Sequence, residues 1–152
     1  MLVGVVSDTH GRMHPGTLEA LAGVERIVHA GDVGDPAILH LLSSIAPVTA
    51  VRGNVDRGDL ARTLPEFETI ELAGTSIYVL HDLSELSLDP AAARFDVVIS
   101  GHTQKARVET KAGVLYLNPG SCGPRRFSLP ITLARLEIAP GRALAKILTL
   151  AG

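Results

Sequence analysis

The sequence predicts a mixed α/β (α+β) protein, a two-sheet β-sandwich flanked by helices. Three observations lead to this fold class. In the first third of the chain, short β-branched segments alternate with helix start signals, which is typical of parallel βαβ units. From about residue 67 onward, strand-like segments come in pairs around turn residues, which is typical of antiparallel hairpins. No linker, repeat or low-complexity tract divides the 152 residues, so we expect one domain over residues 1–152.

The first third of the chain is expected to contain three buried strands and two helices. The strands are short apolar segments rich in β-branched residues, at residues 3–6, 26–29 and 48–51. One helix is expected after Pro15, where apolar residues recur at helical spacing. The other is expected over residues 36–44, because Asp35 is a good N-cap and Pro36 suits the first turn of a helix.

The rest of the chain is expected to be mostly hairpins. The paired segments are residues 67–72 with 75–81, 106–110 with 114–117, and 131–138 with 143–150. Turn residues lie between the members of each pair, as in the dipeptides Ala73-Gly74 and Pro140-Gly141. A further buried strand is expected at residues 97–100, after a short helix at residues 91–94 that Asp89 and Pro90 would start.

Five of the predicted strands end at residues that can bind a metal ion. These strands lie at residues 3–6, 26–29, 48–51, 77–80 and 97–100, and the polar residues after them include Asp8, His10, Asp32, Asn54, His81 and His102. In open α/β sheets, ligands bind outside the carboxyl ends of the strands. Carboxylate, amide and imidazole groups suit divalent cations. The sequence therefore predicts a metal site at one sheet edge.

The types of residue at this site favour two metal ions. Two cations roughly 3.5–4 Å apart can clamp a phosphoryl group, and a carboxylate with two oxygens can bridge them. Asp32 directly follows Gly31, which leaves room for it to act as this bridge. Glycine also precedes Asn54 and His102, and it permits the positive φ and the close backbone approach that a turn around an ion needs.

The same residues, in this order, resemble the motifs of the calcineurin-like metallophosphoesterases. The motifs are Asp8-x-His10, Gly31-Asp32, Gly53-Asn54-x-Asp56, His81 and Gly101-His102-Thr103, and Asn118-Pro119-Gly120-Ser121 extends the match to nearly the whole chain. The likeness is to the small prokaryotic phosphodiesterase branch that also contains the eukaryotic retromer subunit Vps29. It implies the two-sheet metallophosphoesterase fold, without a cap domain.

The resemblance also implies a set of ligands for each ion. One ion would be held by Asp8, His10 and Asp32, and the other by Asp32, Asn54, His81 and His102. The implied reaction is hydrolysis of a small phosphodiester by a water that the two ions activate. Mn²⁺ is the ion that we expect, with Ni²⁺, Mg²⁺, Zn²⁺ and Fe²⁺ as alternatives. No side chain is assigned as the general acid.

Three residues depart from the family pattern. Gln104 stands where the family often has a second histidine that binds the first ion, and an amide oxygen is a weaker donor toward transition metals. We therefore expect either loose binding at the Asp8 side or a preference for a harder ion such as Mg²⁺ or Mn²⁺. Val55 replaces the histidine that protonates the leaving group in larger phosphatases, and Asp82 follows His81 where glycine is usual.

Asn54 and an arginine are expected to contact the substrate. Asn54 could touch a phosphoryl oxygen while it binds the second ion. Arg125, or Arg126 beside it, could offer a guanidinium fork to the phosphate, although a solvated loop arginine is an equal alternative.

The remaining histidines and the single cysteine are expected to have other roles. His29 is expected to pack behind the site, whereas His14 and His40 are expected to be solvated. Cys122 is expected to be a partly buried loop residue without a reactive thiol.

Composition limits the function classes. The net charge of −2 and an aromatic content of 3% argue against binding of long nucleic acid. A DNA nuclease of this chemistry would also need a cap domain or a basic groove. No segment approaches the roughly 20 apolar residues of a membrane span. Met1 leads directly into the first strand, so no signal peptide is expected, and a lone cysteine fits the reducing cytoplasm.

Two function classes remain after these exclusions. The first is a divalent-metal-dependent phosphodiesterase, which the ligand set favours. The second is a weakly active or inactive metal-binding interaction module that resembles Vps29, which Gln104 favours. The family likeness also leaves a homodimer open.

Overall fold

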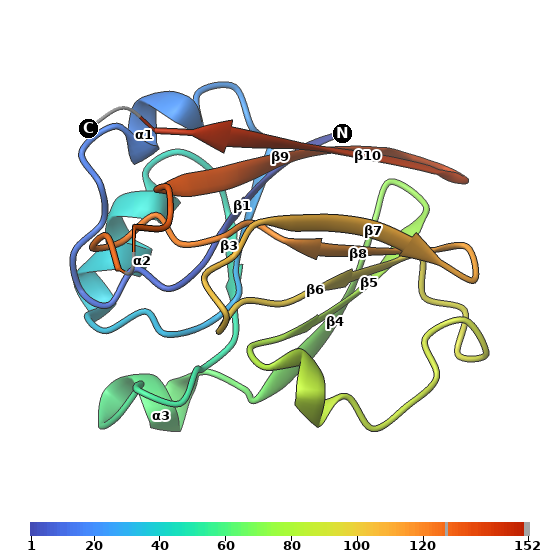
Figure 1. Cartoon of the computed structure of the whole chain (residues 1–152), viewed down its shortest axis with the longest axis horizontal. Coiled ribbons are helices and arrows are strands. Elements are labelled where there is room, and N and C mark those ends of the chain that lie inside the picture. Colours follow the sequence, from blue (N-terminus) through green and yellow to red (C-terminus); the bar gives the residue numbers. More distant parts are fainter. Residues whose placement is uncertain (127, 151–152) are drawn as a thin grey trace.

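Two five-stranded sheets face each other in the computed structural model, which describes residues 1–126 and 128–150 (Figure 1). The first sheet has the order β10-β9-β1-β2-β3. Its strands are β1 (Leu2–Val6), β2 (Arg26–His29), β3 (Val48–Ala50), β9 (Thr132–Ala139) and β10 (Arg142–Thr149). The strands β1, β2 and β3 are parallel, and β9 runs antiparallel to β1. The predicted βαβ units are therefore confirmed.

The second sheet has the order β4-β5-β6-β8-β7. Its strands are β4 (Phe67–Leu72), β5 (Thr75–Leu80), β6 (Val97–Ile99), β7 (Arg107–Lys111) and β8 (Val114–Asn118). The inner strands β5, β6 and β8 are parallel, and the edge strands β4 and β7 are antiparallel to their neighbours. The three predicted hairpins form, with ends that differ from the predicted ones by at most one residue.

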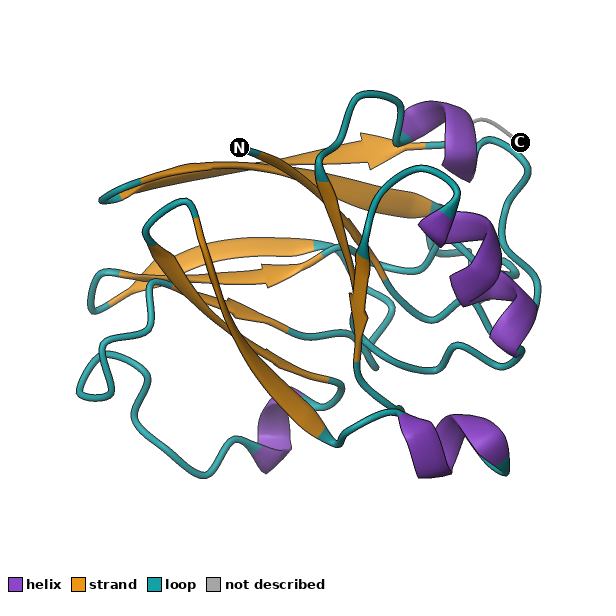
Figure 2. Ribbon diagram, turned by 180° about the vertical axis from the view of Figure 1, so that it is seen from behind, coloured by secondary structure: helices purple, strands orange, loops and turns teal. Residues whose placement is uncertain are grey.

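The main hydrophobic core lies between the two sheets. Val5 of the first sheet and Ile77 and Ile99 of the second are fully buried there. A second apolar cluster fills the outer side of the first sheet, beneath α1 (Thr17–Ala20) and α2 (Pro36–Ser43). Figure 2 shows the helices from behind. The outer face of the second sheet is covered by the loop after β5, which packs Leu83 and Phe95 against it. The predicted sandwich with helices outside is confirmed.

Local sequence signals predicted α1 and α2 but not the remaining helices. Asp35 caps α2 as expected, because its side chain accepts a hydrogen bond from the N–H of Ala37. Helix α1 is only one turn long. Two short helices were not predicted, α3 (Asp59–Thr63) and the 3₁₀ turn η1 (Leu83–Glu85), because neither is long enough to show an apolar period.

The helix predicted at residues 91–94 is wrong. The Asp89 side chain does accept a hydrogen bond from the N–H of Ala91, as an N-cap would. The chain nevertheless turns at Arg94, whose φ is 64°, and the N–H of Phe95 bonds to the carbonyl of Pro90. A turn replaces the helix, and it brings Phe95 to the ring of Tyr78, which it meets edge to face.

No helix among residues 1–126 and 128–150 has the length and apolarity to cross a bilayer.

Candidate metal centre

The predicted ligands converge from both sheets and not from one edge. Asp8, His10 and Asp32 follow β1 and β2 of the first sheet, whereas His81 and His102 follow β5 and β6 of the second. The expectation of a single sheet edge is therefore wrong. Facing sheets bring the carboxyl ends of two sets of parallel strands to the same place, which local sequence patterns do not reveal.

Two overlapping clusters of candidate ligands share one carboxylate. Asp8, His10 and Asp32 each bring a ligand atom within 4.8 Å of the others, and so do Asp32, His81 and His102. The Nε2 atom of His10 lies 3.7 Å from an oxygen of Asp8 and 3.7 Å from an oxygen of Asp32. The two clusters thus have Asp32 in common, which is the residue that the sequence predicted as a bridge between two metal ions.

The second cluster lies tightly against the first. The Nε2 atom of His81 is 3.1 Å from Oδ2 of Asp32 and 3.9 Å from Oδ1 of Asp8. The ring centroids of His81 and His102 are 5.2 Å apart, and the two rings are nearly perpendicular. His102 is the most exposed of the five residues, so the centre opens to solvent on its side.

Three buried polar atoms at this place have no hydrogen-bond partner in the described structure, namely Oδ1 of Asp8, Nε2 of His10 and Nε2 of His81. Buried polar atoms without partners are rare, because each loses its solvation without compensation. The other ring nitrogen of His81, Nδ1, donates to the carbonyl of Ala30 at 2.7 Å, so Nε2 keeps a free lone pair. These atoms fit divalent cations, which would accept the electron pairs that the three atoms leave free.

Burial and neighbouring charges both act on these groups. Burial raises the pKa of the Asp8 carboxyl, although Ser7 and His81 oppose the effect. Burial also acts on Asp32, but His81 and the N–H of Val55 outweigh it, and the pKa of Asp32 is lowered. Burial alone would lower the pKa of His81, yet Asp32 and Asp8 raise it. The two carboxylates therefore attract positive charge to the space between them.

The backbone at the site is unusually strained. Of the nine residues other than glycine that have a positive φ in the described structure, five lie here, with φ between 48° and 71°, namely Asp8, His10, Asp32, His102 and Gln104. L-residues seldom adopt this left-handed conformation, which costs energy that the surrounding structure has to supply. More than half of these positive-φ residues are candidate ligands, and each of the five follows the end of a strand.

Two glycines allow the loops to approach the carboxylates. A Cβ on Gly53 would lie 2.1 Å from Oδ1 of Asp32, and a Cβ on Gly101 would lie 2.7 Å from Oδ2 of Asp8. Close backbone approach is thus the reason for glycine at both positions.

Further residues hold the candidate ligands in place. Oδ2 of Asp8 accepts hydrogen bonds from the hydroxyl of Ser7 at 2.6 Å and from the N–H of His102 at 3.1 Å. Oδ1 of Asp32 accepts one from the N–H of Val55 at 3.0 Å. The remaining oxygen of each carboxylate faces the imidazoles. Ser7 was not singled out in the sequence, since a lone serine before Asp8 gives no signal.

His29 and Asp56 stabilise the loops from behind the site. His29 is fully buried, with Nδ1 accepting from the N–H of Gly31 and Nε2 bonded to the Thr9 hydroxyl at 3.0 Å. Burial lowers the pKa of His29 to about 4, so its ring is neutral. Asp56 accepts hydrogen bonds from the N–H of Gly53 at 2.8 Å and of Gly34 at 2.9 Å. His29 is therefore a packing residue, as expected, and Asp56 ties the β3 loop to the β2 loop.

Three of the predicted site residues are not joined to the cluster by hydrogen bonds or ion pairs within the described parts of the chain. Asn54 is exposed on the loop that encloses Asp32. Gln104 is half-buried two residues after His102, and Arg125 is exposed. Of the other histidines, His40 is exposed and His14 accepts a hydrogen bond from the N–H of Gly16.

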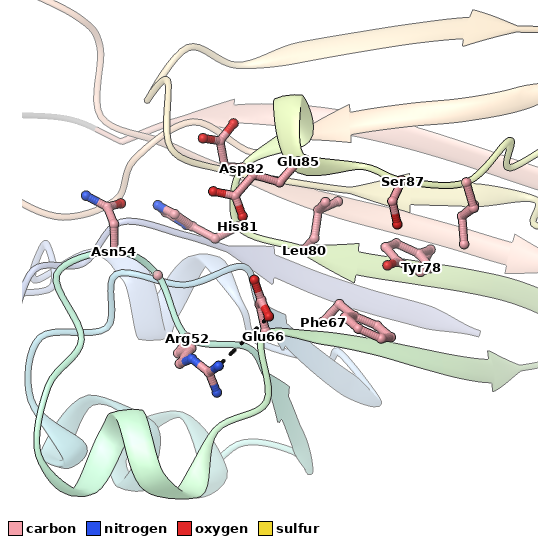
Figure 3. Close-up of a pocket in the computed structure, with 12 residues that line it drawn as sticks. Arg52, Asn54, Glu66, Phe67, Tyr78, Leu80, His81, Asp82, Glu85 and Ser87 are labelled. Carbon is pink, nitrogen blue, oxygen red and sulfur yellow. Dashed lines mark ion pairs between the residues drawn. The ribbon is translucent and has the colours of Figure 1, made fainter.

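A pocket of about 430 Å³ opens beside the cluster. Asn54 and His81 line one end of it, and Phe67 and Tyr78 line another part (Figure 3). His81 thus belongs to both the ligand cluster and the pocket wall. A molecule bound in the pocket would lie next to the candidate metal centre.

Comparison with known proteins agrees with this fold. The sequence matches the family model for the calcineurin-like phosphoesterase superfamily domain over residues 1–141. It is 36% identical over 134 residues to the Probable metallophosphoesterase MJ0623 of Methanocaldococcus jannaschii, with 80% of this chain and 68% of that protein covered. The Phosphodiesterase MJ0936 of the same organism is 27% identical over 142 residues, with 80% of this chain and 84% of that protein covered.

A solved structure of a single mutant of Vps29 from Entamoeba histolytica has the same fold. Its TM-score is 0.79 at 22% identity, with 99% of this chain and 100% of that chain covered. Fold and sequence together define the class as metallophosphoesterases. The chain belongs to the calcineurin-like phosphoesterase superfamily.

Proposed function

We propose that this protein is a divalent-metal-dependent phosphodiesterase that hydrolyses a small phosphodiester at a dinuclear centre. The observation that carries this proposal is the sharing of Asp32 by two ligand clusters, together with unpartnered atoms on Asp8, His10 and His81. The relative that is named a phosphodiesterase supports the choice of a diester. Mn²⁺ as the ion, a homodimer, the cytoplasm as location and a single domain over residues 1–152 stay predictions.

In this proposal, Asp8, His10 and Asp32 hold one ion, with Gln104 in place of a further histidine. Asp32, Asn54, His81 and His102 hold the other. Bound divalent ions would make water a nucleophile near neutral pH and would neutralise the charge on the phosphoryl oxygens.

Hydrogen bonds from the protein orient the residues that would bind the ions and the substrate. The carbonyl of Ala30 orients the imidazole of His81 through Nδ1, and the N–H of Val55 orients the carboxylate of Asp32. Asn54 lines the same end of the pocket as His81, where its amide can donate a hydrogen bond to a phosphoryl oxygen (Figure 3). The centre is rigid because buried hydrogen bonds fix the loops that carry it.

Hydrolysis of bis(p-nitrophenyl) phosphate with added Mn²⁺ tests the proposal. Asp32→Asn should reduce the rate by about 100-fold or more, since it weakens both clusters. Asp59→Asn is the matched control, because Asp59 is an exposed carboxylate on α3 and should leave the rate unchanged.

Activity that survives EDTA, or that is the same in Asp32→Asn as in the wild type, would contradict the proposal. Tight Mn²⁺ binding without turnover of any phosphodiester would instead favour the interaction module that Gln104 suggests.

A further inference from the structure

The pocket beside the metal centre has one polar end and one aromatic part. Asn54, His81 and Asp82 line the polar end, and Phe67 and Tyr78 lie farther from the metal centre (Figure 3). A phosphate held at the centre would therefore carry its ester group into this pocket, because the two spaces share the imidazole of His81. The residues of the pocket then determine which ester group fits.

Aromatic side chains are scarce in this chain but gather at this pocket. The sequence has three phenylalanines and two tyrosines. The rings of Phe67 and Tyr78 are stacked, with centroids 5.5 Å apart and planes at 8° to each other. The ring of Phe95 meets that of Tyr78 edge to face, at a centroid distance of 5.3 Å. Phe67 nevertheless remains 52% exposed. The pocket thus presents an aromatic ring whose orientation is fixed by packing and part of whose surface is open to a ligand.

The charges of the pocket disfavour a second phosphate. Its carboxylates are Glu66, Asp82 and Glu85, and among the residues that line it Arg52 is the only lysine or arginine. The guanidinium of Arg52 is already used, since it donates to the carbonyl of Leu64 at 2.9 Å and lies 4.0 Å from the carboxylate of Glu66. An uncharged group therefore suits the pocket, whereas a further anionic group would meet like charge.

We propose that this pocket binds a planar, uncharged aromatic ring on the ester group of the substrate, with the ring against Phe67. The ring belongs either to a nucleobase or to an aryl alcohol, which share this chemistry. The inference rests on the proposed function, because the phosphate has to be held at the metal centre for its ester group to enter the pocket.

Binding of two pairs of phosphate compounds to the Mn²⁺-loaded protein, measured by calorimetry, tests this inference. The pairs are 5′-AMP against ribose 5-phosphate, and phenylphosphonate against methylphosphonate, so that the members of each pair differ in the ring. Because aromatic stacking is worth about 1 kcal/mol or more, the ring should tighten binding by about fivefold or more in at least one pair. A gain in the first pair alone indicates a nucleobase, and a gain in the second alone indicates an aryl group.

Phe67→Ala should remove this gain and leave the affinity for ribose 5-phosphate and methylphosphonate unchanged. Val108→Ala is the matched control, because Val108 is also apolar and 46% exposed on an edge strand of the same sheet but does not line the pocket. Ser87→Trp is a second variant, which fills the pocket from a loop without removing the stacked pair. It should abolish the gain as well.

Equal affinity within both pairs for the wild type would overturn the inference and leave the proposed function standing. A gain that persists in both Phe67→Ala and Ser87→Trp would also overturn it. If none of the four compounds binds in the presence of Mn²⁺, the proposed function fails and this inference fails with it.

Discussion

At the residue scale, we expect Gln104 to determine how complete the Asp8 side of the proposed centre is. The three residues of that cluster leave Oδ1 of Asp8 and Nε2 of His10 without hydrogen-bond partners. Gln104 follows on the same strained loop as His102, with φ of 64°. An amide oxygen at this position is a poorer ligand for transition metals than the imidazole that the family often has there. The two ions are therefore expected to differ in affinity.

Gln104→His should raise the affinity of the weaker site. The wild type, purified without added metal, should retain less than two ions per chain, whereas the variant should approach two, because an imidazole completes the Asp8 cluster. Metal content by mass spectrometry and Mn²⁺ titration by calorimetry measure this difference. Equal and tight occupancy of two ions in both proteins would show that Gln104 is not a limiting ligand.

At the element scale, the end of β8 and the loop after it support two of the ligand-bearing loops. The side-chain amide of Asn118 donates to the carbonyl of Gly101 at 3.0 Å and to the hydroxyl of Thr103 at 3.1 Å. The hydroxyl of Ser121 donates to the carbonyl of Asp8 at 2.9 Å. The sequence motif that begins at Asn118 thus supports the loops that carry Asp8 and His102, and none of its residues belongs to the two ligand clusters.

Asn118→Ala should weaken Mn²⁺ binding by roughly 10- to 100-fold, the usual cost of losing a group that orients a ligand. The loop that carries His102 would lose two hydrogen bonds, while β8 keeps its backbone pairing. Thr110→Ala on the neighbouring strand β7 is the control, because Thr110 is exposed. Calorimetric titration with Mn²⁺ gives the affinities, and melting in EDTA shows whether the fold is retained. An unchanged Mn²⁺ affinity would mean that the loop that carries His102 keeps its conformation without the side chain of Asn118.

The strands and the hairpin pairs were predictable from the sequence, whereas the division of the ligand-bearing strands between two sheets was not. Short β-branched segments such as Val97–Ile99 end at a glycine or a polar residue, so that their existence and approximate ends follow from local pattern. The placement of β5 and β6 in a second sheet depends on contacts between distant segments. The same limit applies to the site. The motifs identified Asp32 and His81, but the supporting roles of Ser7 and Asn118 depend on loops that meet only in three dimensions.

At the scale of the whole molecule, the buried His29 connects the site to the stability of the fold. It lies fully buried in β2 and bonds to Thr9 and Gly31, next to the loops of both β1 and β2. Burial lowers its pKa from 6.5 to about 4, so the folded protein keeps the ring neutral where the unfolded chain would protonate it. As the pH falls below about 6.5, the unfolded state binds the proton first, and the free energy of unfolding decreases.

The wild type in EDTA should therefore lose about 2 kcal/mol more stability than His29→Gln between about pH 7 and about pH 4.5. Glutamine does not titrate, so only the difference between the two slopes matters and not the loss of packing in the variant. Denaturant unfolding across this pH range measures the slopes. His40→Gln, which changes an exposed histidine on α2, should have the slope of the wild type. Parallel curves for the wild type and His29→Gln would show that His29 does not couple stability to pH.

Anomalous diffraction from a crystal grown with saturating Mn²⁺ tests the central claim most directly. The account predicts two peaks roughly 3.5–4 Å apart, one on each side of the Asp32 carboxylate. One peak should touch Asp8 and His10, and the other His81 and His102. A crystal without a peak at Asp32, or with a single ion that leaves the other cluster empty at saturating Mn²⁺, would contradict the dinuclear centre.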